Sequence, residues 1–341
     1  MAIQKLAVEN FTVFDKMEIE FCDGVNVFIG ENGTGKTHLL KVLYLCLLEC
    51  RIPANVDTQM MDLYLNEIKK TDELSRLFGI NSEFNNGILF RCVRSNAPDD
   101  FKNSFATDEL KDMHKIFIEH STLQEEPIFI PAKEVLSMAK IATLSDKDLI
   151  ALDVDKTLTD IIIKAQNYPL ATPLTNLMDK TLPKLANIID GSIFVDENKS
   201  FWIRKTNGTV IPLTMEAEGF KKLGLLGQLI LNKNIDEGTT LLWDEPEANI
   251  NPKLIPDLVE TILELSRNGV QVFIATHDYF LPKYFEVLSK KFDSLSFHSL
   301  YKTNDNGVKC ETSDKFSTLT NNDIINEKIL LYEAEIEKVM K

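Results

Sequence analysis

Alternating apolar and polar residues open the chain at 3–8 and 16–21, and a continuous apolar stretch follows at 25–29. Alternation is typical of a strand with one buried face, whereas a continuous apolar run indicates a strand that is buried on both faces. The third stretch leads through a glycine-rich segment into the apolar run LLKVLYLCLL at 39–48, which is long enough for a buried helix. The pattern therefore predicts three strands, a loop and a helix at the start of the chain.

Helical periodicity dominates the middle of the chain, as in MDLYLNEIKK at 61–70 and LTNLMDKTLPKLANII at 174–189. Two shorter apolar stretches, at 88–94 and 128–132, are typical of strands. We interpret residues 51–190 as a mostly helical insertion, a subdomain that resembles a lid or an arm.

The pattern changes again after this interval. A helix is expected from about 218 to 232, and two apolar strands, at 239–244 and 270–276, are separated by a helix that starts after Pro252. Short apolar strands separated by a helix indicate a parallel sheet that is buried on both faces. Before them, turn residues separate short strand patterns at 192–196, 200–205 and 209–213.

These elements together predict an α/β fold with a mixed N-terminal sheet, a parallel core sheet and the helical insertion. The core would comprise residues 1–50 and 191–341. Near the end of the chain, apolar residues recur at 4-3 spacing on one helix face. We expect this face to pack onto the core, with a partner interface as the alternative. Its members are Ile325, Ile329, Tyr332, Ile336 and Val339.

Composition narrows the class of protein. The 341 residues include 37 Lys plus Arg against 52 Asp plus Glu, for a net charge of −15. This charge repels nucleic-acid backbones at long range, so nucleic-acid binding would need a local basic patch or a partner. No apolar run approaches the ~18 residues of a membrane span, and the N-terminus lacks a signal-peptide pattern. We therefore expect no membrane partner. The five cysteines are scattered and odd in number, which favours a reducing cytoplasm.

The glycine-rich segment at 30–37, GENGTGKT, matches the pattern G-x-x-x-x-G-K-[ST] in full. Its glycines allow backbone N–H groups to point at phosphate oxygens, and the helix that follows adds its positive end. We expect Lys36 to reach the β- and γ-phosphates and Thr37 to coordinate Mg²⁺. The sequence thus predicts an ATP-binding phosphate loop made of Gly30, Glu31, Asn32, Gly33, Thr34, Gly35, Lys36 and Thr37.

Two carboxylates follow directly at the end of the strand at 239–244. Asp244 would lie at the carboxyl edge of the sheet, beside the phosphate loop, where it can hold Mg²⁺ through water. Glu245 can orient and deprotonate the attacking water. The alternative is a helix N-cap and a first-turn acid ahead of Pro252.

His277 stands just past the strand at 270–276, where it can contact the γ-phosphate; a structural histidine is the alternative. We assign Glu245 and His277 as candidate catalytic residues, and Thr37 and Asp244 as candidate metal ligands.

In this order and separation, the three motifs resemble those of the ABC-type ATPase heads of the SMC, RecF and OLD-like superfamily. The resemblance covers residues 1–50, which include GENGTGKT, and residues 190–280, which include TTLLWDEPEANINP and VFIATHD. Within this superfamily, the chain looks most similar to compact AAA-type ATPases found beside toxins and nucleases in bacterial anti-phage systems.

The resemblance implies that two chains bind two ATP molecules between them, each closed by the partner's signature segment. Residues 216–219, Glu-Ala-Glu-Gly, match that segment, and residues 247–252 resemble the D-loop. Gly219 would then contact the γ-phosphate in trans, whereas Ala217 stands where many relatives have Ser.

Three other positions have weaker matches. Gln124 is the candidate for the glutamine of the family's Q-loop. Phe11 and Phe14 could approach the nucleotide, but we expect both to pack in the core.

The implied function is an Mg²⁺-dependent ATPase that forms a homodimer or a higher even oligomer and acts as a switch in anti-phage defence. Because no acidic cluster with nuclease spacing follows His277, the nuclease or toxin that it regulates is expected on another chain. One alternative is a DNA-repair or recombination ATPase that binds duplex DNA in the dimer groove. Another is a scaffold that binds ATP without hydrolysing it.

Overall fold

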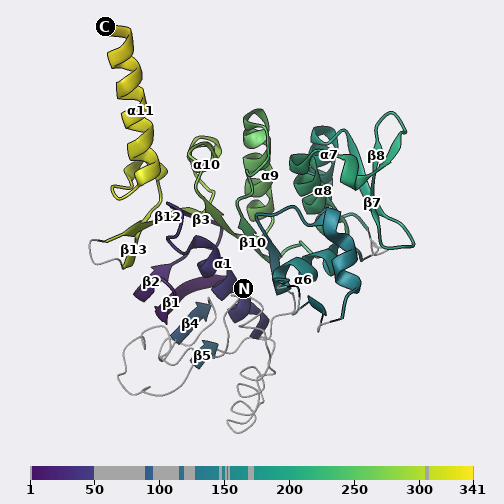
Figure 1. The fold of residues 1–341 in the computed structure, drawn as a ribbon, viewed down its shortest axis with the longest axis horizontal. Helices are drawn as coiled ribbons and strands as arrows, with labels where there is room; N and C mark the ends of the chain where they lie inside the picture. The colour runs from purple at the N-terminus through teal and green to yellow at the C-terminus, as the bar shows by residue number, and fades with distance from the viewer. Residues whose placement is uncertain are drawn as a thin grey trace.

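The structure is a computed structural model, and the strands it describes form three sheets (Figure 1). The description covers residues 2–49, 89–94, 115–118, 127–145, 148–149, 152, 154–167, 173–303 and 307–340.

The central sheet has six described strands in the order β13-β12-β3-β11-β10-β6. Every neighbouring pair is parallel except β12 and β13, which are antiparallel. The predicted parallel core sheet is therefore confirmed, and β11 lies between β3 and β10. The strands are β3 (Val25–Gly30), β6 (Ile128–Ile130), β10 (Thr240–Asp244), β11 (Gln271–Thr276), β12 (Leu295–Lys302) and β13 (Val308–Ser313).

Both faces of this sheet are buried. Side chains of successive strand residues point to opposite faces, so neighbouring residues of one strand belong to different core clusters. In β10, Leu241 and Trp243 belong to one core cluster and Leu242 to the other. Helices α7 to α10 lie on one side of the sheet in Figure 1, and α1 lies on the opposite side. The helices are α1 (Lys36–Glu49), α6 (Lys156–Ala165), α7 (Asn176–Ile188), α8 (Glu218–Leu231), α9 (Ile255–Arg267) and α10 (Phe280–Leu288).

A second sheet covers α1 and has the order β2-β1-β4-β5. It is mixed, as predicted: β1 is antiparallel to β2 and β4, whereas β4 and β5 are parallel. The Gln271 side chain connects it to the central sheet, since it accepts from the Ile3 N–H and donates to the Ile3 carbonyl, both at 2.8 Å. The strands are β1 (Ile3–Phe11), β2 (Phe14–Glu20), β4 (Leu89–Arg94) and β5 (Lys115–Ile118).

The third sheet is an antiparallel meander beside α7 and α8, which confirms the three short strands predicted before residue 214. Its members are β7 (Gly191–Val195), β8 (Phe201–Lys205) and β9 (Val210–Pro212).

The interval 51–190, predicted as an insertion, also contributes strands to both large sheets. The apolar stretches at 88–94 and 128–132 form β4 and β6, as expected for strands. The helix expected at 61–70 lies outside the described residues, while the periodicity near 174–189 corresponds to α7. The existence of a separate insertion subdomain remains a prediction.

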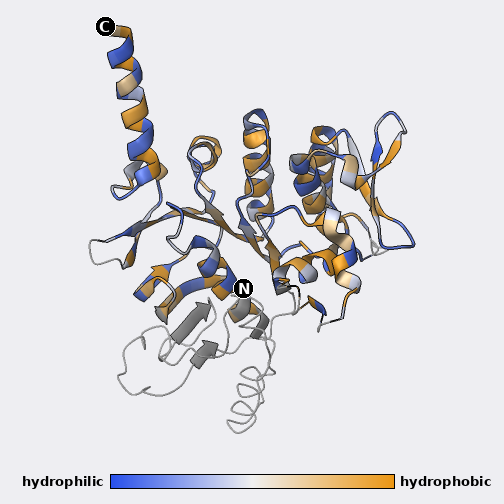
Figure 2. Cartoon of the chain, viewed as in Figure 1, coloured by the Kyte–Doolittle hydropathy of each residue, from blue (hydrophilic) through white to orange (hydrophobic). Residues whose placement is uncertain are grey.

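The expectation that the last helix packs onto the core is wrong beyond its first turn. Helix α11 (Asp323–Met340) projects away from the edge of the central sheet at β13 (Figures 1 and 2). Ile325 packs against the core, and the Lys328 ammonium lies over the rings of Tyr279 and Phe280. Ile329, Tyr332 and Ile336, farther along the helix, are exposed. Among the described residues, no helix is long and apolar enough to span a membrane.

Candidate functional site

The phosphate loop runs from the end of β3 into α1, as the motif predicts. Gly35 has a φ of +85°, and a Cβ at this position would lie 2.4 Å from the Phe14 ring. Only glycine combines this left-handed backbone with so close a contact. Phe14 and Phe11 are both buried in the core, which confirms the expected core packing of these two rings.

Lys36 lies across the loop. Its ammonium donates to the carbonyls of Gly30 and Glu31, both at 2.7 Å. Burial lowers the pKa of the Lys36 ammonium, and the carboxylates of Glu245 and Asp244 act in the opposite direction. The carbonyl contacts hold a partly desolvated cation at the place where phosphate oxygens are expected.

The Thr37 hydroxyl donates to Asp244 Oδ2 at 2.8 Å, which joins the phosphate loop to the end of β10. Burial raises the pKa of the Asp244 carboxyl, and the Thr37 hydrogen bond acts in the opposite direction. Two adjacent oxygen donors of this kind fit Mg²⁺, which prefers hard oxygen ligands and retains several waters. The helix-cap alternative for Asp244 is wrong, because Asn251 provides the cap ahead of Pro252.

Glu245 Oε1 lies 2.8 Å from His277 Nδ1, so the structure brings the two candidate catalytic side chains together. Glu245 has a φ of +45°, which is uncommon for a residue other than glycine. Its N–H donates to the Ala275 carbonyl at 2.8 Å, which holds this residue against the end of β11.

Glu247, the first residue of the D-loop segment, belongs to the same cluster, although we did not predict it as a catalytic or metal-binding residue. Its Oε1 accepts from the Thr276 hydroxyl at 2.5 Å. Burial raises the pKa of the Glu247 carboxyl to about 7, while the Thr276 hydrogen bond acts in the opposite direction. The position of Glu247 two residues after Glu245 was the available sequence signal for a site residue. The burial of its carboxyl depends on tertiary packing, which the local sequence does not show.

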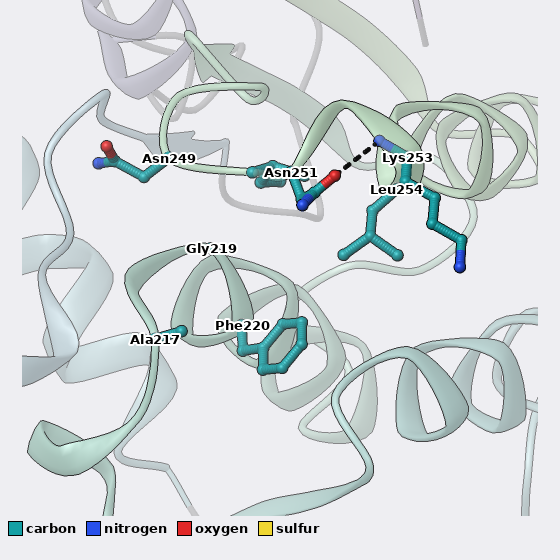
Figure 3. Close-up of a pocket in the computed structure, with 8 residues that line it drawn as sticks. Ala217, Gly219, Phe220, Asn249, Asn251, Lys253 and Leu254 are labelled. Carbon is teal, nitrogen blue, oxygen red and sulfur yellow. Dashed lines mark hydrogen bonds between the residues drawn. The ribbon is translucent and has the colours of Figure 1, made fainter.

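Gly219 stands in the first turn of α8, directly against the D-loop segment (residues 247–252), as Figure 3 shows. A Cβ at Gly219 would lie 2.5 Å from the Asn249 carbonyl oxygen. A cavity of about 320 Å³ opens between α8 and this segment. Ala217 is the N-cap of α8 and has no side-chain oxygen to accept a hydrogen bond there, unlike Ser. The contact of Gly219 with a second copy remains a prediction.

Two lysines near the site were not found from the sequence. Lys302, at the end of β12, lies over the tip of the phosphate loop, where its Nζ is 3.4 Å from the Asn32 carbonyl and 3.8 Å from the Glu31 carboxylate. Lys222 of α8 donates to the Glu245 carbonyl at 3.0 Å. Gln124, the Q-loop candidate, lies outside the described residues.

The sheet order and the loop that joins β3 to α1 define an α/β P-loop NTPase. Its fold is similar to that of an SMC head solved in complex with the C-winged helix domain of ScpA, with a TM-score of 0.51 at 13% identity. The similarity covers 93% of this chain and 99% of that one. At 13% sequence identity, this structural similarity is evidence for the fold alone.

Family models identify the chain more closely. The model described as "AAA domain, putative AbiEii toxin, Type IV TA system" matches residues 94–281, and one described as "AAA domain" matches residues 5–126. Because the first match spans more than half of the chain, the protein belongs to this family of AAA-type ATPase domains.

Curated relatives include the DNA replication and repair protein RecF. The RecF of Streptococcus uberis is 32% identical over 79 residues, which are 23% of this chain and 22% of the relative. The RecF of Clostridium kluyveri is 22% identical over 201 residues, or 55% of this chain and 52% of the relative. The chain thus spans between a fifth and about half of the length of these relatives.

The close contact at Gly219 can be tested with two substitutions on one helix. Gly219→Ala should destabilise the protein by about 1–3 kcal/mol, because the new methyl group displaces the Asn249 carbonyl. The control is Gly227→Ala on α8, where the nearest atom to a new Cβ is the Leu185 side chain at 3.7 Å. This control should be neutral or stabilising by up to about 1 kcal/mol. Urea unfolding measures both, and a Gly219→Ala protein as stable as the parent would contradict the contact.

Proposed function

We propose that the protein is an Mg²⁺-dependent ATPase that dimerises head to head and switches a separate effector protein. The observation that carries the proposal is the convergence of five side chains at one edge of the central sheet. They are Lys36, Thr37, Asp244, Glu245 and His277. Membership of an AAA-type ATPase family supports it.

Each side chain has a distinct role in this proposal. The loop N–H groups and Lys36 would bind the phosphates, and Thr37 and Asp244 would hold Mg²⁺, which would neutralise phosphate charge when bound. Glu245 orients the attacking water and accepts its proton. His277 holds the Glu245 carboxylate through the 2.8 Å contact and extends toward the γ-phosphate from the end of β11.

The effector is proposed to be a nuclease or a toxin in bacterial anti-phage defence. The matching family description mentions a putative toxin and a toxin–antitoxin system, which supports this choice. Dimerisation is supported by the arrangement of Gly219 and the D-loop segment around one open cavity, where a second chain could present its nucleotide. We also propose that the protein is cytoplasmic. Residues 51–190 are proposed to be an insertion in the ATPase core.

A second candidate function is a DNA-repair-type ATPase that binds duplex DNA. The sequence similarity to RecF, whose name refers to DNA replication and repair, favours it. The net charge of −15 disfavours it, because counterion release at a DNA backbone requires a basic surface.

Replacing the candidate base tests the proposed chemistry. Glu245→Gln should lower steady-state ATP turnover by ~10²–10⁴-fold while ATP still binds, because the amide cannot accept the proton of water. Lys36→Ala should lose binding of a non-hydrolysable ATP analogue in calorimetry. Glu237→Gln, an exposed acid outside the site, is the control and should keep full turnover. Unchanged turnover in Glu245→Gln would exclude Glu245 as the base.

Duplex DNA distinguishes the two candidate functions. Under the effector proposal, ATP turnover should be unchanged when duplex DNA is added at low salt. If DNA stimulates turnover, and the stimulation falls steeply as salt rises, phosphate contacts are involved and the DNA-repair function is favoured. Turnover is measured with and without DNA at two salt concentrations, with Lys36→Ala as the background control.

A further inference from the structure

Lys222 is a buried lysine on α8 with its charge beside the candidate catalytic centre. The residue is 2% exposed, and its ammonium donates to the Glu245 main-chain carbonyl at 3.0 Å. Burying a charged group is unfavourable unless nearby groups compensate for the lost hydration. Here burial lowers the pKa of the ammonium, and the carboxylates of Glu247, Glu245 and Asp244 act in the opposite direction. The cation is thus tied to the end of β10.

The atom that Lys222 contacts belongs to the residue with the unusual backbone. At a φ of +45°, Glu245 occupies the left-handed region, which persists only where surrounding contacts hold it. On one side its N–H donates to Ala275 of β11, and on the other its carbonyl accepts from Lys222 and from the Ala248 N–H. Ala275 and Ala248 contact Glu245 through main-chain atoms, whereas Lys222 contacts it through a side chain that comes from α8. The direction of the Glu245 side chain toward His277 depends on this backbone.

The same helix begins at the surface where a second copy is proposed to dock. Gly219 precedes Lys222 by three residues, so the two are neighbours on adjacent turns of α8. A displacement of the first turn of α8 would therefore move the Lys222 ammonium relative to the Glu245 carbonyl.

We propose that Lys222 is a positioning residue, which holds the Glu245 main chain and thereby couples docking of a second copy at Gly219 to hydrolysis. The inference rests on the proposed ATPase function. It adds that α8 and Lys222 connect the proposed dimer surface at Gly219 to the candidate base Glu245. In this proposal Lys222 acts through Glu245, whose main-chain carbonyl accepts from its ammonium.

The adjacent residue provides a matched control. Lys221 is also buried on α8, but its ammonium donates to the Ser137 hydroxyl at 3.0 Å and lies 3.9 Å from the Glu134 carboxylate. Lys221→Met therefore removes a buried lysine from the same helix without touching Glu245.

The experiment compares Lys222→Met with Lys221→Met and the parent in ATP binding, ATP turnover and ATP-dependent dimerisation. In Lys222→Met, kcat should fall about 10- to 100-fold, the scale for a misplaced catalytic group. Its affinity for a non-hydrolysable ATP analogue should stay within about twofold of the parent's, because the phosphate loop is untouched. Its ATP-bound dimer, followed by light scattering, should persist longer than the parent's. Lys222→Arg, which keeps a charged donor, should recover much of the lost kcat.

Three results would overturn the inference. One is a kcat for Lys222→Met within threefold of the parent's, and another is an equal loss in Lys221→Met. The third is loss of analogue binding in step with kcat, as expected from a purely structural role. If Lys222→Met does not fold, Lys222→Gln gives the same comparison with a neutral, shorter side chain. If the ATPase proposal itself is wrong, the result is different. The parent would then hydrolyse no ATP, or its turnover would be unaffected by Glu245→Gln.

Discussion

The site depends on the parallel pairing of β3, β11 and β10. In this register Ile29 lies opposite Thr276, and Ala275 lies opposite Asp244, so the three strands end at one level. Because parallel strands present their carboxyl ends at the same edge, segments more than 200 residues apart in the chain converge there. The Thr37–Asp244 hydrogen bond joins the end of the phosphate loop, which follows β3, to the end of β10. The Glu245–His277 contact joins the residues that directly follow β10 and β11. Backbone pairing therefore sets the geometry, and the side chains supply the chemistry.

This arrangement places charged groups where water is scarce. Burial lowers the pKa of Lys36 and raises the pKa values of Asp244 and Glu247. Groups held this way are suited to bind phosphate and metal, since a ligand charge replaces the lost hydration. The same reasoning applies to Lys222, whose ammonium is compensated by carboxylates and by a carbonyl of the cluster. The region around Glu245 is thus a connected network that extends from the phosphate loop to α8.

Local patterns in the sequence predicted much of this network. The GENGTGKT segment, the apolar strand that ends in Asp244 and the strand before His277 appear in the structure as expected. Each of these signals lies within ten residues or fewer, where periodicity and motif spacing are informative. The expected core packing of Phe11 and Phe14 is also present in the structure.

The features that were missed depend on contacts between distant segments. Lys302 reaches the phosphate loop because β12 pairs with β3, and strand order is not encoded in local periodicity. Lys222 resembles a surface lysine in the sequence, and its burial depends on where α8 packs. The 4-3 spacing of α11 identifies an apolar helix face but not its partner, and most of that face is exposed here.

The central claim is that two chains complete one ATP site, with Gly219 of each chain serving the other. The most direct test is ATP turnover per chain across a wide dilution series, with the oligomeric state measured at the same concentrations. We predict that turnover per chain falls on dilution in step with the loss of dimers, because a single chain lacks the contact in trans. Constant turnover per chain at concentrations where only monomers are present would contradict the account.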